Sequence, residues 1–416
     1  MREWPKYATG PWLASATHTR VHRAAPRARS SLHQGRASRL PYDAPVSRPL
    51  RLAYLADPNS VHTRRWLGFF ADRGHDVTLL VGTEDIVLPG LHSAIRRHPY
   101  RRFGRRRLPF ISSIQGRRRL RAALATVGPE ILHAHYLTRY GWQARLSGFH
   151  PCVITPWGSD LFVTPHESRR ARLWAGLTLR GADLVTVVSD HMQAEVVRYG
   201  APTDRIARIM FGVDTDRFAP DAHVSPPRAL VGRPFILAPR AIRPLYRPDV
   251  VIEAFTQLPP MVHLVMTTRN AEPTTLDDAR RRIARNALGD RVHLLDAIDD
   301  DLMLDLFRTA ALVVSVPESD AVPISILESM ACGRPVVATD LPGPRERLGS
   351  ISPQLLVPVG DVAETARALR SVLEMPASAR ASLGALLRAD AVANADLRRN
   401  MERMEELYLM LRGRAR

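Results

Sequence analysis

Short apolar segments alternate with amphipathic segments along most of this chain. Residues 51–56, RLAYLA, are mostly apolar, residues 62–74 carry aromatic side chains at helical spacing, and residues 76–82, DVTLLVG, are mostly apolar again. Strand-length apolar runs that alternate with amphipathic helices are typical of a parallel sheet covered on both faces. The pattern therefore predicts an α/β fold with doubly wound, Rossmann-like sheets. The later runs expected as strands read ILHAH, CVIT, DLVTVV, FILA, MVHLVMTT, RVHLLDA, LVVSV and VVA.

The length of the chain predicts two domains and a tail. A chain of 416 residues exceeds what one hydrophobic core usually supports. The start of the chain lacks hydrophobic periodicity and is rich in Arg, Ser, Ala, Pro and His, which favours disorder or a transit peptide. The predicted division is a basic disordered tail, a first domain, a linker, a second domain and a final helix, at 1–49, 50–220, 221–233, 234–395 and 396–416.

Residues 312–346 are the most informative segment and read LVVSVPESDAVPISILESMACGRPVVATDLPGPRE. The first five residues are apolar and mostly β-branched, which favours a buried parallel strand. Pro323 has the φ preferred at the first helical position, and Gly-Arg-Pro supplies a stop, so a helix is expected from Pro323 to about Cys332. The next strand is expected from Val336.

Two carboxylates flank the start of that helix. The crossover places the turn and the helix start at the carboxyl edge of the sheet, where open α/β folds bind ligands. Free N–H groups and the helix dipole make Pro323 and Ile324 a natural phosphate site. Glu328 can then reach paired hydroxyls such as those of a ribose, and Asp320 is expected to meet the group beyond the phosphates. An isolated acidic pair is more often only capping and surface charge.

The whole run of residues 319–346 resembles the acidic-pair signature of the retaining GT-B glycosyltransferases of the family-4 type, the glycosyl transferases group 1. That signature is usually Glu-x7-Glu followed by Ala-Cys-Gly-x-Pro-Val-Val, and Asp320 replaces the first Glu here. The resemblance implies that Glu328 binds the nucleotide ribose and Asp320 the donor sugar; Glu318 is an alternative with a longer spacing. It also implies two domains facing a cleft, with a final helix, 396–416, that crosses back to the first domain.

The predicted second domain opens with cations suited to a diphosphate and reads FILAPRAIRPLYRPDVVIEAF. Related transferases have an arginine and then a lysine some five residues apart before such a helix. Arg240 matches the arginine, whereas Tyr246 or a neighbour stands where the lysine is expected. The resemblance implies that Arg240 and Arg243 bind the donor diphosphate, with Arg247 as the alternative second cation. No metal-ligand cluster is visible in the sequence, so these cations and the helix start are expected to compensate the charge without metal or cofactor.

Histidines end one predicted strand of the first domain. His133 and His135 lie on the same side of the pleat in ILHAH. Related transferases commonly have a His-x-His here, with the second histidine facing the donor sugar. The resemblance implies a catalytic contact from His135 to the sugar or its leaving phosphate, and His133 is expected in the core.

Two further turns are candidates for acceptor or cleft contacts. The sequence TPWGSD follows an apolar run and suits a cleft-lining turn, which contains Trp157 and Asp160. Trp157 is expected either to stack on an acceptor sugar or to be a buried anchor. The first turn, from Pro58, lacks the Gly-Gly pair of the family, and His62 and Arg65 are the candidates there.

The formal net charge of +18 gathers in two segments. Residues 1–50 carry nine basic and two acidic side chains, and Arg96–Arg121 carries eleven arginines and no acid. In the second segment aromatic and aliphatic residues interleave with the arginines, which suits an anionic membrane surface. Nucleic acid would be attracted by the same field, and a solvated helix face is the simplest alternative. The resemblance favours the membrane over nucleic acid, because many such transferases act on lipid-linked acceptors.

Other features exclude some classes of protein. No apolar stretch has membrane-spanning length, and no signal-peptide pattern is present. Cys152 and Cys332 form neither a disulfide framework nor a metal spacing and are expected as buried residues in a reducing compartment. These features predict a cytoplasmic protein, peripheral on the inner face of the plasma membrane.

The sequence as a whole predicts a retaining, metal-independent hexosyltransferase. It is expected to move a sugar from a nucleotide-sugar donor to the hydroxyl of an unknown acceptor, such as a lipid-linked or cell-surface polysaccharide precursor. No side chain is a convincing covalent nucleophile, so the resemblance implies that the departing diphosphate takes the acceptor's proton. The alternatives are a nucleotide-sugar epimerase or phosphorylase on the same fold, or a non-enzymatic protein that binds anionic surfaces.

Overall fold

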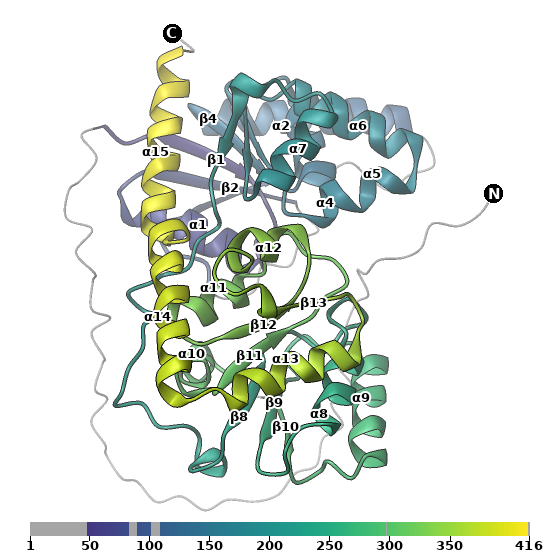
Figure 1. The fold of residues 1–416 in the computed structure, drawn as a ribbon. Coiled ribbons are helices and arrows are strands. Elements are labelled where there is room, and N and C mark those ends of the chain that lie inside the picture. The colour runs from purple at the N-terminus through teal and green to yellow at the C-terminus, as the bar shows by residue number, and fades with distance from the viewer. Residues whose placement is uncertain (1–47, 83–89, 101–108, 297, 415–416) are drawn as a thin grey trace, which may run out of the picture. The chain divides into compact units, whose positions relative to one another are not determined.

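The computed structural model describes residues 48–82, 90–100, 109–296 and 298–414. These residues form two parallel sheets, each covered by helices (Figure 1). The predicted fold class, two doubly wound Rossmann-like domains, is confirmed. The tail predicted at 1–49 lies outside the described residues, apart from its last two.

The first sheet has the strand order β3-β2-β1-β4-β5-β6-β7, and every neighbouring pair is parallel. Its strands are β1 Arg51–Leu55, β2 Asp76–Gly82, β3 Arg96–Tyr100, β4 Ile131–His135, β5 Cys152–Thr155, β6 Leu184–Val187 and β7 Ile206–Arg208. Its helices are α1 Val61–Asp72, α2 Pro109–Val127, α3 Trp142–Ser147, α4 Ser159–Phe162, α5 Thr164–Glu167, α6 Arg169–Arg180 and α7 Asp190–Arg198, with a π-helical turn at Leu137–Gly141.

The second sheet has the order β10-β9-β8-β11-β12-β13 and is parallel throughout. Its strands are β8 Phe235–Ala238, β9 His263–Thr267, β10 Val292–Leu295, β11 Leu312–Ser315, β12 Val336–Thr339 and β13 Leu356–Val357. Its helices are α8 Pro248–Thr256, α9 Pro273–Arg285, α10 Asp300–Thr309, α11 Ile324–Ala331, α12 Pro342–Leu348, α13 Val362–Glu374 and α14 Ala377–Asn394.

Both sheets reverse their strand order at the first strand of the sheet, which positions the candidate site. In the first sheet β1 lies between β2 and β4, and in the second β8 lies between β9 and β11. The connections that leave neighbouring strands at such a point diverge and open a crevice at the carboxyl edge. The loops after β1, β5, β8 and β11 carry most of the predicted site residues.

The structure corrects two local predictions. Pro323 has φ −60° and ψ 125°, so it is the extended residue that precedes α11 instead of its first helical residue. The strand β3 was not predicted, because its sequence RRHPY lies in the basic segment and lacks an apolar run. It pairs only with β2 at the edge of the sheet, where proline and exposed arginines are tolerated.

The last two helices run beside different sheets. Helix α14 packs against α11, whereas α15, Leu397–Arg414, contacts α1 and β4 of the first sheet (Figure 1). Cys152 and Cys332 are buried and free, as predicted. Among the described helices, none combines the length and apolar composition that crossing a bilayer requires.

Candidate functional site

A cavity of about 230 Å³ lies between the loops at the carboxyl edges of the two sheets. The loops after β1 and β5 and residue Phe211 form one side, and the loops after β8 and β11 form the other. Six of the predicted site residues line it: His62, Trp157, Arg240, Asp320, Pro323 and Ile324. The other five predicted residues, Arg65, His135, Asp160, Arg243 and Glu328, are not part of this lining.

Asp320 and Arg240 form an ion pair at the cavity. An Arg240 nitrogen lies 2.7 Å from an Asp320 oxygen, and both side chains are about one-fifth exposed. Burial raises the pKa of Asp320 above its ordinary value, and the charge of Arg240 opposes this shift. Arg240 also lies over the ring of Tyr246, 4.0 Å from its centroid, which holds the guanidinium in place. The cavity thus contains one cation that is already oriented.

The start of α11 faces the same cavity through Pro323 and Ile324. No side chain caps this helix start. Backbone N–H groups in the first turn of a helix lack intrahelical partners, so an anion can accept hydrogen bonds there. The start of α11 and Arg240 can therefore both bind to the same phosphorylated group.

Glu328 lies further along α11 and pairs with the first domain. Its carboxylate is 3.3 Å from Arg65 of α1, and its side chain is 13% exposed. Burial raises the pKa of Glu328, while the nearby Arg65 charge lowers it. Arg65 lines a small space beside the main cavity together with His62 and Phe211. A ligand that uses Glu328 has to compete with Arg65 for its carboxylate.

The side of the cavity that belongs to the first domain is aromatic. Trp157 and Phe211 stack with ring centroids 4.4 Å apart, and His62 lies 5.1 Å from the Trp157 ring. Burial, followed by the charges of Arg65 and Arg240, lowers the pKa of His62 to about 4. His62 is therefore neutral near pH 7.

His135 lies behind the aromatic side of the cavity and is only 2% exposed. Its ring lies 5.4 Å from the Trp157 ring and 4.7 Å from His133, and neither ring nitrogen has a hydrogen-bond partner among the described residues. Burial, and then His62, lowers the pKa of His135 to about 3. The predicted contact between His135 and the donor sugar remains a prediction. His133 is in the core, as predicted, and its ring bonds to Tyr408 and Thr155.

Asp160 holds the loop that contains Trp157 in place. The side chain is fully buried and accepts hydrogen bonds from the backbone N–H groups of Leu137, Trp157 and Gly158. Burial raises its pKa to about 6, and those N–H groups act in the opposite direction. Asp160 is fully buried and outside the cavity lining, and its predicted contact with the cleft stays a prediction.

The second predicted cation for the diphosphate is not at the cavity. Arg243 is exposed and donates to the backbone oxygen of Asn270. Arg247 is held by Asp249 and Glu318. In the described structure Arg240 alone of these three arginines lines the cavity.

Among the lining residues that the sequence did not single out as site residues are two aromatic ones, Phe211 and Tyr246. Phe211 opens the stretch FGVDTDRFAP, which lies directly before the predicted linker and carries no charged or catalytic pattern at Phe211 itself. Tyr246 was seen only as a substitute for lysine, and stacking on an arginine six residues earlier has no sequence signal of its own. No group of three or more His, Cys, Asp or Glu side chains that could hold a metal ion occurs within the described ranges.

These features define a two-domain fold of the GT-B class with a site between its sheets. A family model described as glycosyl transferase 4-like matches residues 51–189, and one described as glycosyl transferases group 1 matches residues 225–386. The chain belongs to the glycosyl transferases group 1 family.

Among similar curated proteins is D-inositol 3-phosphate glycosyltransferase 2 of Catenulispora acidiphila, 28% identical over 283 residues, which are 59% of this chain and 63% of that protein. The D-inositol 3-phosphate glycosyltransferase of Geodermatophilus obscurus is 29% identical over 286 residues, 62% of this chain and 63% of that protein. Both matches cover less than two thirds of the length of the relative.

Solved structures share the fold. Sucrose-phosphate synthase of Thermosynechococcus elongatus has a TM-score of 0.72 at 22% identity, with 88% of this chain and 99% of that chain covered. The Anabaena protein HepE, solved in complex with UDP, has a TM-score of 0.70 at 17% identity, with 86% and 100% covered. At these identities the likeness establishes the GT-B fold.

Proposed function

We propose that the protein is a glycosyltransferase that moves a sugar from a nucleotide-sugar donor to an acceptor hydroxyl. The observation that carries this proposal is one cavity where Asp320, Arg240 and the start of α11 face Trp157 and His62. One side can hold a phosphorylated donor, and the aromatic side suits the faces of a sugar. Family membership and a relative solved with UDP-glucose support a nucleotide-sugar donor.

The donor is placed by the acidic pair in this proposal. The diphosphate accepts hydrogen bonds from the start of α11 and from Arg240, and Asp320 accepts from hydroxyls of the sugar. The ribose hydroxyls donate to Glu328 after Arg65 has turned away. The departure of Arg65 also frees a cation near the donor, which can approach the phosphates in place of Arg243.

Charge compensation without a metal is part of the proposal. The bond from the sugar to the diphosphate breaks, and the negative charge that develops is stabilised by Arg240 and the helix start. The acceptor oxygen bonds to the sugar carbon that the diphosphate leaves, and the departing phosphate takes the acceptor's proton on the same face, without a covalent intermediate on a side chain. Transfer in this way retains the anomeric configuration.

Of the two candidate histidines, His62 is the one at the cavity. We assign it a hydrogen bond to the sugar or to its leaving phosphate, for which its neutral ring has one donor and one acceptor nitrogen. His135 packs behind the Trp157 ring. A direct contact from His135 requires the ring of Trp157 or His62 to move.

For the acceptor and for the location of the protein in the cell, we keep the predictions made from the sequence. We propose an acceptor hydroxyl on a lipid-linked or cell-surface precursor, reached from the cytoplasm. Much of the basic segment predicted to face the membrane, including residues 101–108, lies outside the described residues. Within the described part, the arginines of this segment on β3 and α2 are exposed: Arg96, Arg97, Arg117, Arg118, Arg119 and Arg121.

A thermal-shift screen of UDP-, GDP-, ADP- and TDP-sugars tests donor binding, because a ligand that binds only the folded state raises the unfolding temperature. Glu328→Ala should weaken binding of the active nucleotide-sugar about 10- to 100-fold, since it removes charge-assisted hydrogen bonds. Glu318→Ala, which removes an exposed carboxylate paired with Arg247, is the matched control and should bind normally. An unchanged shift in Glu328→Ala overturns the ribose assignment.

Product analysis with a donor labelled in the sugar separates transfer from the alternatives. Label in a new glycoside, with the anomeric configuration of the donor, supports retaining transfer. Label that remains in an epimerised nucleotide-sugar identifies an epimerase, and label in a sugar phosphate identifies a phosphorylase. Chelators should leave the rate unchanged if the reaction is independent of metal.

A further inference from the structure

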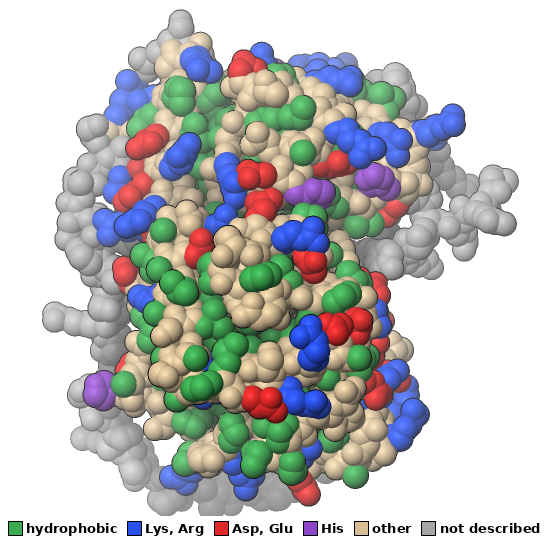
Figure 2. Space-filling view, viewed as in Figure 1, with side chains coloured by type: hydrophobic (Ala, Val, Ile, Leu, Met, Phe, Trp, Pro, Cys, Tyr) green, Lys and Arg blue, Asp and Glu red, His purple; other side chains and the backbone are tan. Residues whose placement is uncertain are grey.

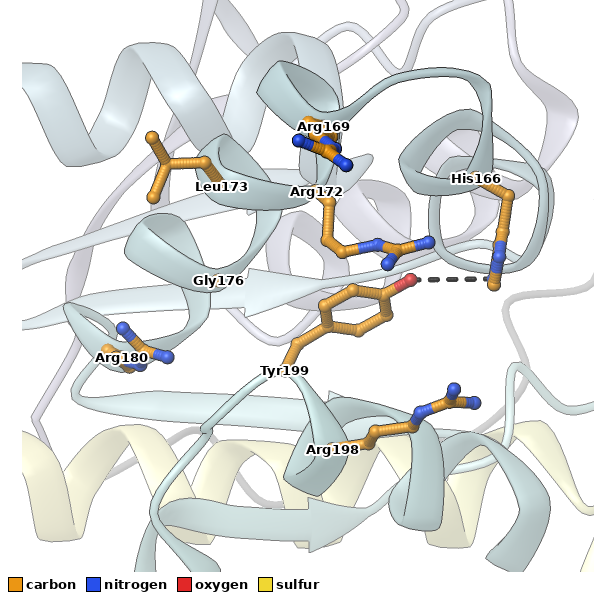
Figure 3. A pocket seen from close by; sticks show the side chains of 8 residues that line it. All are labelled: His166, Arg169, Arg172, Leu173, Gly176, Arg180, Arg198 and Tyr199. Atoms are coloured by element: carbon orange, nitrogen blue, oxygen red, sulfur yellow. Dashed lines mark hydrogen bonds between the residues drawn. The ribbon is translucent and has the colours of Figure 1, made fainter.

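A second cavity, of about 360 Å³, lies in the first domain between α5, α6 and the end of α7 (Figure 3). None of its lining residues lines the cavity between the sheets. Figure 2 shows blue Lys and Arg side chains gathered over this part of the first domain. Its lining, named here the arginine cavity, consists of His166, Arg169, Arg172, Leu173, Gly176, Arg180, Arg198 and Tyr199.

The charges of the arginine cavity are poorly compensated. Glu195 is the acid close to it, 3.5 Å from Arg198 and 3.7 Å from His166. The other three arginines, Arg169, Arg172 and Arg180, have no carboxylate within ion-pair distance among the described residues. Their like charges repel one another across a shared cavity, so an anion that enters relieves a cost already present in the fold.

The helix α6 arranges these cations on one face. Arg169, Leu173, Gly176 and Arg180 follow one another at spacings of four, three and four residues, which places them along one stripe of the helix. Arg172 projects from the neighbouring row toward Tyr199, as Figure 3 shows. Arg169 and Arg180 are therefore the two ends of this stripe, and Leu173 and Gly176 lie between them.

Glycine and tyrosine shape the interior. A Cβ atom at Gly176 would lie 3.1 Å from the backbone oxygen of Tyr199, so α6 lies close to the backbone after α7 at this point. The Tyr199 ring is mostly buried, and its hydroxyl lies 3.4 Å from His166 Nε2. The pocket is thus a defined space with a phenol and an imidazole between arginines.

We propose that the arginine cavity is a binding site for a phosphate-bearing ligand, separate from the donor site. A guanidinium offers paired N–H donors that match two oxygens of one phosphate, and several of them can surround a single group. The hydroxyl of Tyr199 and the ring of His166 supply further hydrogen bonds. The volume accommodates a pyrophosphate or a phosphorylated polyol rather than a single small ion.

The phosphate can belong to a soluble molecule or to a lipid headgroup. Leu173 and Trp174, beside the arginines on α6, are 55% and 45% exposed, so apolar surface adjoins the cavity. Such surface suits the acyl region near a headgroup, whereas a soluble ligand needs only the cavity. Both sources present the same chemistry to the arginines, and the experiment separates them.

Isothermal titration with pyrophosphate tests the site. The protein is prepared with Arg240→Gln, which weakens phosphate binding at the donor cavity, so that any loss on further substitution reports the arginine cavity. Adding Arg169→Gln and Arg172→Gln should weaken pyrophosphate binding at least about tenfold, since two charge-assisted contacts are lost. The matched control adds Arg117→Gln and Arg118→Gln on α2, which removes the same charge from exposed positions.

The control protein should bind pyrophosphate as tightly as the Arg240→Gln parent. Equal weakening in both proteins means a general charge effect and overturns the proposal, as does the absence of pyrophosphate binding in the parent. Unfolding temperatures without ligand show that each protein is folded. The proposal does not depend on glycosyl transfer, so failure of the donor screen leaves this test intact.

Sedimentation with vesicles of phosphatidylcholine and phosphatidylglycerol identifies the source of the phosphate. Arg117 and Arg118 belong to the segment proposed to face the membrane, so some loss of vesicle binding is expected in the α2 control. A larger loss in the Arg169→Gln and Arg172→Gln protein than in that control supports the site and assigns it to a lipid headgroup. Pyrophosphate binding that depends on these arginines, without vesicle binding, supports the site and assigns it to a soluble phosphorylated ligand. Vesicle binding that only the α2 substitutions remove, together with unaltered pyrophosphate binding in the cavity variant, overturns the proposal.

Discussion

At the scale of single residues, arginines occupy both carboxylates of the acidic pair. Asp320 pairs with Arg240 in the same domain, and Glu328 pairs with Arg65 from the other sheet. Burial raises the pKa of both acids, so an unpaired negative charge on either carboxylate is unfavourable. A ligand whose hydroxyls bond to these two carboxylates must replace the ion pairs with its own hydrogen bonds. This favours ligands that also bring negative charge for the released arginines.

The partly buried histidine at the cavity, His62, predicts a dependence of stability on pH. An unfolded histidine ionises near pH 6.5, whereas burial lowers the pKa of His62 to about 4. Between pH 6.5 and 4 the unfolded chain binds more protons, so His62 makes the free energy of unfolding fall as pH falls through this window. His62→Gln should reduce that fall by on the order of 1–3 kcal/mol, measured by urea unfolding at pH 7 and pH 4.5.

The control for this measurement is His223→Gln, at an exposed position before the second sheet. It should leave the difference between the two pH values unchanged. An identical pH dependence in His62→Gln and the unmodified protein would show that His62 ionises normally in the folded state.

Candidate site residues could be singled out from the sequence where their neighbours in the site are close along the chain. Asp320 and Glu328 stand out because one turn and one helix fix their spacing, and Arg240 stands out beside an apolar strand. The Arg65–Glu328 pair joins residues 263 positions apart, and no local pattern signals it. The choice between His62 and His135 likewise depended on which ring Trp157 covers.

At the scale of elements, the acidic turn between β11 and α11 depends on its neighbour α12. Ala321, directly after Asp320, packs against Gly343 at the start of α12, where a Cβ atom would lie 1.5 Å from the Ala321 oxygen. Ala321 also meets Gly158 of the first domain, whose φ is +128°. Only glycine allows this approach of the chain on both sides of the turn.

Gly343→Ala should therefore displace the turn that carries Asp320. We expect a loss of about 1–3 kcal/mol in the free energy of unfolding, as for other overpacked sites, and a smaller thermal shift with the donor. Denaturant unfolding and the donor thermal shift measure the two effects.

Gly413→Ala, where no atom lies within 4 Å of the added carbon, is the control. It should leave donor binding unchanged and stability equal or slightly higher. Normal donor binding by Gly343→Ala would mean that the turn tolerates the displacement or plays no part in binding.

Strands and helices were predictable because their signals are local. The predicted strands before and after α11 match β11 and β12 within one residue. The strand β3 was missed because its pairing with β2 is made by position at the sheet edge and not by apolar side chains. The shift of Pro323 by one position reflects its extended ψ, which the sequence does not specify.

At the scale of the whole molecule, the end of the chain returns to the first sheet. Val213, after β7, pairs in a bridge with Asp396, and α15 then runs beside α1 and β4. The hydroxyl of Tyr408 lies 2.8 Å from that of Tyr54 and 2.5 Å from His133 Nδ1. Glu405 of the same helix bonds to His75 and Arg73. A buried polar cluster therefore fixes α15 to the first domain.

Tyr408→Phe should destabilise the protein by about 1–3 kcal/mol, because His133 Nδ1 and the Tyr54 hydroxyl both lose their hydrogen bond to Tyr408 in the core. Urea unfolding measures the effect. Tyr136→Phe, which removes an exposed hydroxyl bonded to Ser159, is the matched control and should cost less than about 0.5 kcal/mol. Equal small losses in both variants would argue against an anchoring role for the Tyr408 hydroxyl.

The sequence by itself determined the doubly wound sheets, the acidic turn with its helix, and the family resemblance, because periodicity and short motifs depend on neighbours in the chain. The tertiary structure decided which side chains share the cavity, that Glu328 faces Arg65, that Asp160 supports a loop, and that four arginines of α6 and α7 line a second cavity. These outcomes depend on how segments far apart in sequence pack, and burial then sets which charges are paired and which remain open to a ligand.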